Sequence, residues 1–361
     1  MIKRKRLAAF AAIASLGLVV AACGSDGDDG ASDTTAAAAE GGSESTAAPS
    51  GDLKLGIAYD TGGRGDGTFN DAAGRGADQA KTELGFQLDE LEAVSDEDRQ
   101  PNLEALTANG DNPVIAVGFL FSDTLGTVAA ANPDTQYGIV DGFLDPCLDE
   151  GTNVHCLGFA EEQGSFLVGA AAALKSETGH IGFIGGQEID LIKKFEAGYI
   201  AGAKAVNPDI KIESAYLGAA GDNAAWGSPD KAKGIALGWY ADGADVIYSA
   251  AGGSGNGTIE AAVEADKWAI GVDSDQYLTA SSEEAKAHIL TSMLKRVDVA
   301  VFETAKAIAD GTPLPGVVTY DLAVDGVGYA TSGGYVDDIK EKLEEYKQQI
   351  IDGTIVVPTA P

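Results

Sequence analysis

The chain has 361 residues, which is enough for two domains of ordinary size, each with its own core. Fifty-six acidic side chains oppose 24 basic ones, giving a formal net charge of −32. Because such a surface repels a phosphate backbone, and because the one basic cluster stands at the extreme N-terminus, the composition excludes nucleic acid as a partner.

Residues 1–22 have the pattern of a signal peptide. Four cations at positions 3–6 precede an apolar run over 7–22 that is short for a permanent membrane span. The run ends in VAAC, which resembles a bacterial lipobox and predicts lipidation of Cys23. The alternative is an ordinary signal peptide with an incidental cysteine. We expect a lipid anchor that holds the protein on the extracytoplasmic face of the cell membrane.

Residues 23–51 contain mostly Gly, Ser, Thr, Ala and Asp, so they cannot bury enough apolar surface to fold. They are predicted to form a flexible tether between the lipid and the folded chain.

Two further cysteines, Cys147 and Cys156, would reach an oxidising compartment in an exported protein, so a disulfide between them is expected. The alternative is a pair of free buried thiols. Only His155 lies near them, and we therefore predict no metal site.

From residue 53 onward, short β-rich runs alternate with longer amphipathic runs, a pattern that predicts βαβ units, mostly parallel sheets and two lobes. The predicted strands are 53–59, 87–91, 114–117, 137–140, 155–159, 181–184, 210–217, 246–249, 268–272 and 289–292. The predicted helices are 71–83, 102–109, 122–131, 163–175, 192–206, 229–241, 258–265, 297–310 and 334–351.

The first strand runs directly into a glycine-rich loop, GGRGDGTFN, at residues 62–70. Such a loop at the carboxyl end of a parallel strand is a typical ligand site. Within it, Asp66, Phe69 and Asn70 combine an anion, a flat stacking surface and an amide, which suits a polar heteroaromatic ring. The alternative is structural: Asp66 caps a turn, Phe69 packs under the helix and Asn70 is the helix N-cap.

Two other strand ends carry candidate ligand contacts. The sequence GFLFSD at 118–123 places Phe121, Ser122 and Asp123 after a strand, where a phenylalanine that points outward would face the same cleft as Phe69. The loop AAGGSGNG at 250–257 fits no phosphate-binding fingerprint, so Gly252 and Gly253 are expected to admit a neutral polar ligand closely.

The remaining candidates lie in the second half of the chain. Asp273 ends a strand and is interpreted as a hydrogen-bond acceptor for ligand hydroxyls rather than as half of a glycosidase dyad. Lys295 closes an S-x-x-K motif, but the supporting elements of penicillin-recognising enzymes are missing, so it is interpreted as a cationic donor. Trp226 is in a loop that could reach the cleft.

Taken together, the lipobox and the motifs GGRGDGTFN (62–70), GG (185–186), AGGSG (251–255), IGVDSDQ (270–276) and TSMLKRVD (291–298) resemble the basic membrane protein family. These are substrate-binding lipoproteins of ABC transporters, and the best-known members bind purine nucleosides. The resemblance covers residues 53 to about 358.

The resemblance implies a type I periplasmic-binding-protein fold, with two Rossmann-like α/β lobes joined by a three-segment hinge. The N-terminal lobe is expected to comprise 52–159 with 290–315, and the C-terminal lobe 160–289 with 316–361. The three crossovers are expected near 159–161, 287–295 and 313–318.

The resemblance also implies roles for individual residues. Phe69 would stack on one face of a base and Phe195, in KFEAG, would form the opposite wall. Asn70 and Asp123 would read the edge of the base.

In the same way, Asp273 and Lys295 would hold ribose hydroxyls, while Gly252 and Gly253 would admit the sugar. The implied function is capture of a small polar ligand, a purine nucleoside, for an ABC importer with permease and ATPase subunits. The alternatives are a sugar receptor of an ABC importer and a ligand-sensing lipoprotein in signalling. We expect a monomer that needs neither a cofactor nor a metal and is not an enzyme.

Overall fold

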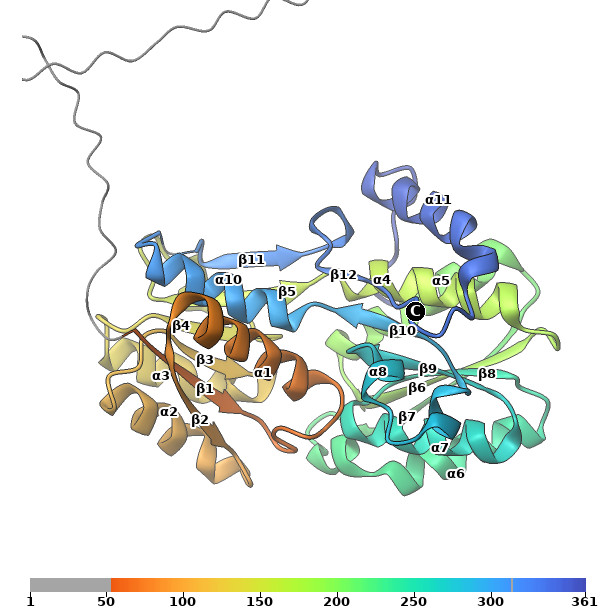
Figure 1. Cartoon of the computed structure of the whole chain (residues 1–361), viewed down its shortest axis with the longest axis horizontal. Coiled ribbons are helices and arrows are strands. Elements are labelled where there is room, and N and C mark those ends of the chain that lie inside the picture. The colour runs from red at the N-terminus through yellow and green to blue at the C-terminus, as the bar shows by residue number, and fades with distance from the viewer. Residues whose placement is uncertain (1–52, 313) are drawn as a thin grey trace, which may run out of the picture. The chain divides into compact units, whose positions relative to one another are not determined.

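The computed structural model of the protein describes residues 53–312 and 314–361, all of which fall in one compact unit. The predicted signal peptide (1–22), the lipidation site Cys23 and the tether (23–51) lie outside the described residues. Within the described ranges, no helix is both long enough and apolar enough to cross a membrane. Two six-stranded sheets flanked by helices form the architecture (Figure 1), and we call each sheet with its helices a lobe.

The first sheet comprises β1 (Lys54–Tyr59), β2 (Gln87–Glu92), β3 (Val114–Val117), β4 (Tyr137–Val140), β5 (Val154–Phe159) and β11 (Val317–Tyr320). All its pairings are parallel, and the order is β11-β5-β4-β3-β1-β2. The order reverses between β1 and β3. In an open α/β sheet, the crevice outside the strand ends at such a switch point is the usual place for a ligand.

The second sheet comprises β6 (His180–Glu188), β7 (Lys211–Ala219), β8 (Val246–Ala250), β9 (Trp268–Asp273), β10 (Ile289–Lys295) and β12 (Val327–Tyr329). Its order, β12-β10-β9-β8-β6-β7, repeats the topology of the first sheet, with the switch point between β6 and β8. Only the edge strand β12 pairs antiparallel. Apart from the edge strands β11 and β12, each strand end in one lobe therefore has an equivalent in the other.

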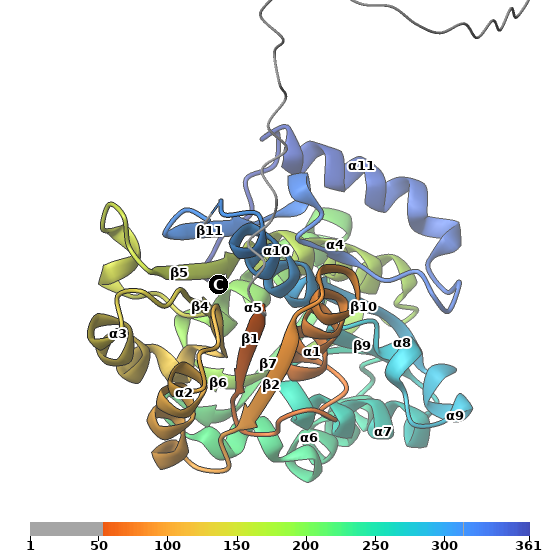
Figure 2. The ribbon, with the colours of Figure 1, turned by 60° about the vertical axis from the view of Figure 1, so that its left-hand side comes forward.

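The helices are α1 (Phe69–Gln79), α2 (Arg99–Ala108), α3 (Ser122–Ala131), α4 (Glu161–Lys175), α5 (Asp190–Val206), α6 (Pro229–Ala241), α7 (Gly255–Ala265), α8 (Gln276–Thr279), α9 (Glu283–Lys286), α10 (Val297–Ala309) and α11 (Lys340–Ile351). Figure 2 shows α1 beside α10 on the first lobe, where the Cα of Gly76 approaches the backbone of Asp298. Short 3₁₀ turns join several of these elements.

The predicted α/β alternation and two-lobe fold are confirmed, and four elements, β3, β4, α3 and α6, have the predicted bounds. The strands β11 and β12 were not predicted. Both lie at sheet edges and are largely not buried, unlike the equally short β3 and β4, which are fully buried.

The chain crosses between the lobes after β5, after β10 and between β11 and β12. The first crossing lies at the expected place. The other two lie further along the chain than the expected 287–295 and 313–318. Strand pairing explains the difference, because β10 pairs with β9 along most of its length and β11 pairs with β5. Residues 290–295 therefore belong to the second sheet and 317–320 to the first, unlike the expected lobe boundaries.

Helices α4 and α5 approach each other unusually closely through glycines (Figure 1). A Cβ on Gly198 would lie 2.1 Å from the Glu162 carbonyl oxygen, and one on Gly202 would lie 1.9 Å from that of Phe166. Since α4 follows the first crossing and α5 carries Phe195, this close packing fixes a wall of the cleft relative to the hinge.

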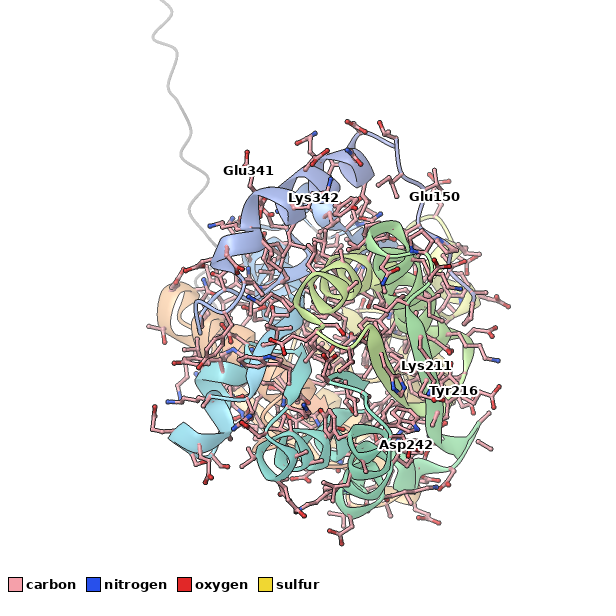
Figure 3. The ribbon with its side chains drawn as sticks, turned by 90° about the vertical axis from the view of Figure 1, so that its right-hand side faces the viewer. Glu150, Lys211, Tyr216, Asp242, Glu341 and Lys342 are labelled. Atoms are coloured by element: carbon pink, nitrogen blue, oxygen red, sulfur yellow. A yellow bond between two sulfur atoms is a disulfide. The ribbon has the colours of Figure 1, made fainter. Side chains whose placement is uncertain are left out.

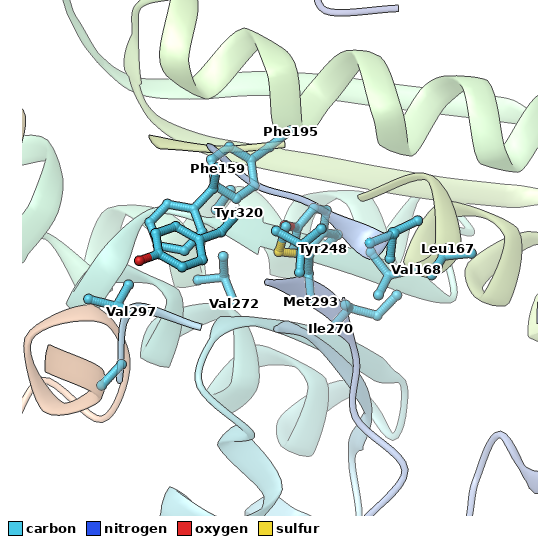
Figure 4. Packing of buried hydrophobic residues seen from close by; sticks show 14 of the residues in the cluster. Phe159, Leu167, Val168, Phe195, Tyr248, Ile270, Val272, Met293, Val297 and Tyr320 are labelled. Carbon is cyan, nitrogen blue, oxygen red and sulfur yellow. The ribbon is translucent and has the colours of Figure 1, made fainter. Parts of the chain in front are cut away.

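Aromatic side chains fill the core beside the hinge. Figure 4 shows Phe159, Phe195 and Tyr320 near one another, and the rings of Phe159 and Tyr320 stack with centroids 5.3 Å apart. On the outside, acidic side chains such as Glu150, Asp242 and Glu341 project into solvent (Figure 3). The structure joins Cys147 and Cys156 in a disulfide.

Candidate ligand-binding site

A cavity of about 320 Å³ lies between the two lobes, where the carboxyl ends of both parallel sheets face each other. Most of the predicted binding residues line it: Asp66, Phe69, Asn70, Phe195, Trp226, Gly252, Gly253, Asp273 and Lys295. Phe121, Ser122 and Asp123 do not line it. The cavity volume lies in the range of pockets for small organic ligands.

Asp66 builds the loop after β1. Its carboxylate accepts hydrogen bonds from the backbone N–H groups of Thr68 and Asn70, both at 2.9 Å, and of Asp71 at 3.2 Å. Burial raises the pKa of Asp66, while these N–H donors lower it. The structural interpretation of Asp66 therefore holds, and the residue also borders the cavity.

Phe69 and Asn70 are the first two residues of α1, and both line the cavity. Asn70 is not the N-cap, because Thr68 occupies that position. The Asn70 side chain is buried, and its Oδ1 has no hydrogen-bond partner among the described residues. A buried acceptor of this kind is costly unless a ligand provides a donor.

Lys295, the last residue of β10, is the electrostatic centre of the cavity. Its Nζ lies 2.6 Å from Asp141 Oδ2 and 3.4 Å from Asp273 Oδ1, the second being an ion-pair distance without hydrogen-bond geometry. The ammonium also lies 4.7 Å from the ring centroid of Phe69 and 5.5 Å from that of Phe195. Burial alone would lower the pKa of Lys295, but the neighbouring carboxylates raise it, so the side chain stays charged.

Asp141 was not predicted as a site residue. Asp141 directly follows β4, and Asp273 is the last residue of β9. These two strands occupy equivalent positions in the two sheets. Both residues have a left-handed backbone conformation, with φ of 62° and 64°. Such conformations are strained for non-glycine residues and cluster at functional sites. Oδ1 of each carboxylate lacks a hydrogen-bond partner within the described part of the chain. The parallel between Val140-Asp141 and Val272-Asp273 is the sequence signal that could have identified it.

The second lobe contributes Trp226 from the 3₁₀ turn Asn223–Gly227. Its ring packs over Gly186 in β6, where a Cβ would lie 2.2 Å from the indole. Across the cleft, the ring of Phe119 meets Trp226 edge to face, with centroids 6.3 Å apart.

The prediction of Phe121, Ser122 and Asp123 as cavity residues is wrong in this geometry. Gly118 has a φ of 119°, and the 3₁₀ turn that follows it brings Phe119 to the cavity and leaves Phe121 fully buried in the core under α3. Ser122 donates to the Phe119 carbonyl oxygen, and Asp123 is exposed in the first turn of α3.

The two lobes touch on both sides of the cavity. On one side, the hydroxyl of Thr279 donates to the Gly67 carbonyl oxygen at 2.9 Å, and Arg75 donates to Ser274 Oγ at 2.9 Å. On the other side, Asn223 Nδ2 donates to Asp96 Oδ1 at 3.0 Å. These contacts describe a closed cleft.

Comparison with known proteins agrees with this geometry. The chain is 36% identical to a CD4+ T-cell-stimulating antigen of Listeria innocua over the full length of both. It is 35% identical to the ABC transporter nucleoside-binding protein BmpA of Lactococcus lactis, covering 85% of this chain and 90% of that protein. A solved ABC transporter solute-binding protein from Aeropyrum pernix matches with a TM-score of 0.72 at 28% identity, covering 85% of this chain and 94% of that one.

The fold and the interlobe cleft define a substrate-binding protein of the ABC-transporter class. A family model described as ABC transporter substrate-binding protein PnrA-like matches residues 54–360, so the chain belongs to the Bmp family of such proteins.

Proposed function

We propose that this protein captures a nucleoside, most favourably a purine nucleoside, in the interlobe cleft and delivers it to the permease and ATPase of an ABC importer. The observation that carries the proposal is the group formed by Lys295, Asp141 and Asp273 beside the rings of Phe69 and Phe195. One ammonium and two carboxylates with free oxygens suit neighbouring hydroxyls, while the rings suit a flat base. The name of the Lactococcus relative supports the same ligand class.

The charges in the cavity favour a nucleoside over a nucleotide. Asp60, Asp66, Asp141 and Asp273 all line it, whereas Lys295 is the single cation among its lining residues and is already paired. A phosphate would be repelled by these carboxylates. Neutral ligands with several hydrogen-bonding groups are expected instead.

Ligand binding would stabilise the closed cleft. Phe69, Asn70 and Asp141 come from the first lobe, and Phe195 and Asp273 come from the second, so one ligand would contact both. A ligand that binds the closed form more tightly shifts the equilibrium between open and closed forms towards closure. The three crossings would serve as the hinge.

We further propose that the mature protein is attached through lipidated Cys23 to the extracytoplasmic face of the membrane. The cationic start, the apolar run over residues 7–22 and the VAAC tetrapeptide support this anchor. Tethering keeps the receptor within reach of its permease without a membrane span.

Phe69→Ala is expected to reduce nucleoside affinity by about 5- to 150-fold, because a stacked aromatic ring contributes about 1–3 kcal/mol per base. Isothermal titration measures the loss. Phe143→Ala is the matched control, since Phe143 is 60% exposed and does not line the cavity. Equal affinities for both variants would show that Phe69 does not contact the ligand.

Binding is expected to weaken below pH 6. Burial raises the pKa of Asp273 to about 6; Lys295 opposes this shift, and Asp141 and Asp66 add to it. Because a protonated Asp273 cannot accept from a ligand hydroxyl as a carboxylate does, affinity should be constant above pH 6 and fall about 10-fold per pH unit below it. Asp273→Asn should bind weakly and remove this dependence. An unchanged dissociation constant between pH 5 and pH 7 would contradict the assignment.

The raised pKa of Asp273 also makes the stability of the unliganded fold depend on pH, in the opposite direction to ligand affinity. The unfolded chain ionises Asp273 near pH 4 and the folded chain near pH 6, so this residue destabilises the fold progressively as pH rises between these values.

A thermal-shift screen of nucleosides, free bases and monosaccharides tests the proposed function. A ligand present at 100 times its dissociation constant stabilises the fold by about 2.7 kcal/mol. Nucleosides should raise the melting temperature. A shift with a monosaccharide and none with any nucleoside would favour the sugar-receptor alternative.

A further inference from the structure

Asp60, directly after β1, presents a free carboxylate oxygen at the cavity wall. The residue is 8% exposed and lines the cavity. Its hydrogen bonds come from Thr61 and from Nε and Nη2 of Arg99, and all of them go to Oδ1. Among the described residues, Oδ2 accepts none. It lies beside Gly118, 3.0 Å from the position that a Cβ would take there.

Arg99 holds this carboxylate in place. Its guanidinium is buried, lies 2.8 Å from Asp60 Oδ1, and sits over the ring of Phe121 at 6.0 Å. Another of its nitrogens, Nη1, donates to Asp96 Oδ1, the same oxygen that Asn223 reaches from the second lobe. Burying an ion pair seldom adds net stability, so stability alone does not account for this arrangement.

Asp60 and Asp141, the ion-pair partner of Lys295, stand at the ends of different strands of the first sheet. Asp60 follows β1 and Asp141 follows β4, with β3 between them in the sheet. Neighbouring strands are about 4.8 Å apart, so the two strand ends are separated by about 10 Å. That separation matches the length of a ligand made of one base and one sugar. Phe119 follows β3, and both Phe119 and its partner Trp226 also line the cavity.

We propose that Asp60, positioned by Arg99, is a second anchor that accepts a hydrogen bond from a donor at the end of the ligand remote from Lys295. This inference rests on the proposed nucleoside function and deepens it. The required chemistry is an N–H or O–H donor, which a nucleoside can supply either from the base edge or from the 5′-hydroxyl. With a donor from the base, Asp60 would take the edge-reading role expected of Asp123, which lies outside the cavity.

The test begins with the unaltered protein and three probes. Adenosine is compared by isothermal titration with purine riboside, which lacks the exocyclic amino group, and with 5′-deoxyadenosine, which lacks the 5′-hydroxyl. Removing the donor that meets Asp60 leaves Oδ2 of a buried carboxylate without a hydrogen bond, so one of the two analogues should bind about 10- to 100-fold more weakly. Which analogue is weaker identifies the source of the donor.

Variants of Asp60 and Arg99 then test whether Asp60 causes this loss of affinity, which we call the penalty. Asp60→Asn should reduce the penalty for the weaker analogue to less than about 3-fold, and Arg99→Lys should reduce it partly, because a lysine cannot hold the carboxylate with two nitrogens. Asp310→Asn is the control, since Asp310 pairs only with Lys306 on the surface of α10 among the described residues. This control should retain the full penalty. The ratio of the affinity for adenosine to that for the weaker analogue is informative, because a merely structural change would weaken the binding of both ligands alike.

Two results would overturn the inference. One is adenosine and both analogues binding the unaltered protein within about 3-fold of each other. The other is a penalty that survives unchanged in Asp60→Asn. If no nucleoside binds at all, the proposed function itself fails, and this inference fails with it.

Discussion

Lys295→Met is expected to abolish nucleoside binding and to lower the free energy of unfolding by about 3–5 kcal/mol at neutral pH. Methionine keeps much of the apolar stem but removes the charge between Asp141 and Asp273, whose side chains are 6% and 8% exposed. Two buried carboxylates would then face each other without a cation. Chemical denaturation and isothermal titration measure the two effects.

The stability loss in Lys295→Met should shrink as pH falls. Burial raises the pKa of Asp273 to about 6, and removing the cation that opposes this shift would raise it further. Below that value the carboxyl group is neutral in the variant, so less charge is left uncompensated. Lys306→Met is the control, because Lys306 is 43% exposed and its loss should change stability by less than about 1 kcal/mol. Wild-type affinity in Lys295→Met would refute the central role of this ammonium.

Gly202→Ala is expected to destabilise the fold by about 3 kcal/mol, at the upper end of the cost of overpacking. The new Cβ would stand 1.9 Å from the Phe166 carbonyl oxygen, and backbone cannot yield as a side-chain tip can. Helix α5 must therefore move away from α4. Because α5 carries Phe195, nucleoside affinity should fall as well.

Gly238→Ala provides the matched control for Gly202→Ala. Gly238 is also inside a helix, α6, but a Cβ there would meet no heavy atom within 4 Å. Alanine is the better helix former by about 1 kcal/mol, so this variant should be as stable as the parent or more stable. Similar unfolding free energies for the two variants would show that the α4–α5 contact does not constrain the fold.

Much of the site could be predicted from the sequence because buried parallel strands end in recognisable loops. The glycine-rich stretch after β1, the glycines after β8 and Asp273 at the end of β9 each follow an apolar run. Parallel strands bring their carboxyl ends to one edge, so residues at these ends converge without any further information.

Asp141 was not predicted, although it also follows an apolar run directly. Gly142 and Phe143 follow it, but nothing local in the sequence pairs Asp141 with Lys295, which lies 154 residues further along the chain. Asp141 and Asp273 meet at Lys295 because β4 and β9 occupy equivalent places in the two sheets, as the strand order shows.

Local backbone geometry determines whether Phe119 or Phe121 lines the cavity. Two residues apart, both follow β3, and neither hydrophobicity nor spacing distinguishes them. The positive φ of Gly118 and the 3₁₀ turn after it decide which ring reaches the cavity. A turn of this kind leaves no clear signature in residue type.

Isothermal titration of the purified protein with adenosine, inosine and guanosine, alongside D-ribose and adenosine 5′-monophosphate, tests the central claim most directly. We predict that at least one nucleoside binds with one-to-one stoichiometry. Ribose lacks the base that the aromatic rings would stack on, and the nucleotide carries a phosphate that the cavity carboxylates repel, so each should bind at least about 100-fold more weakly. Tight binding of ribose or of the nucleotide, with no heat from any nucleoside, would contradict the account.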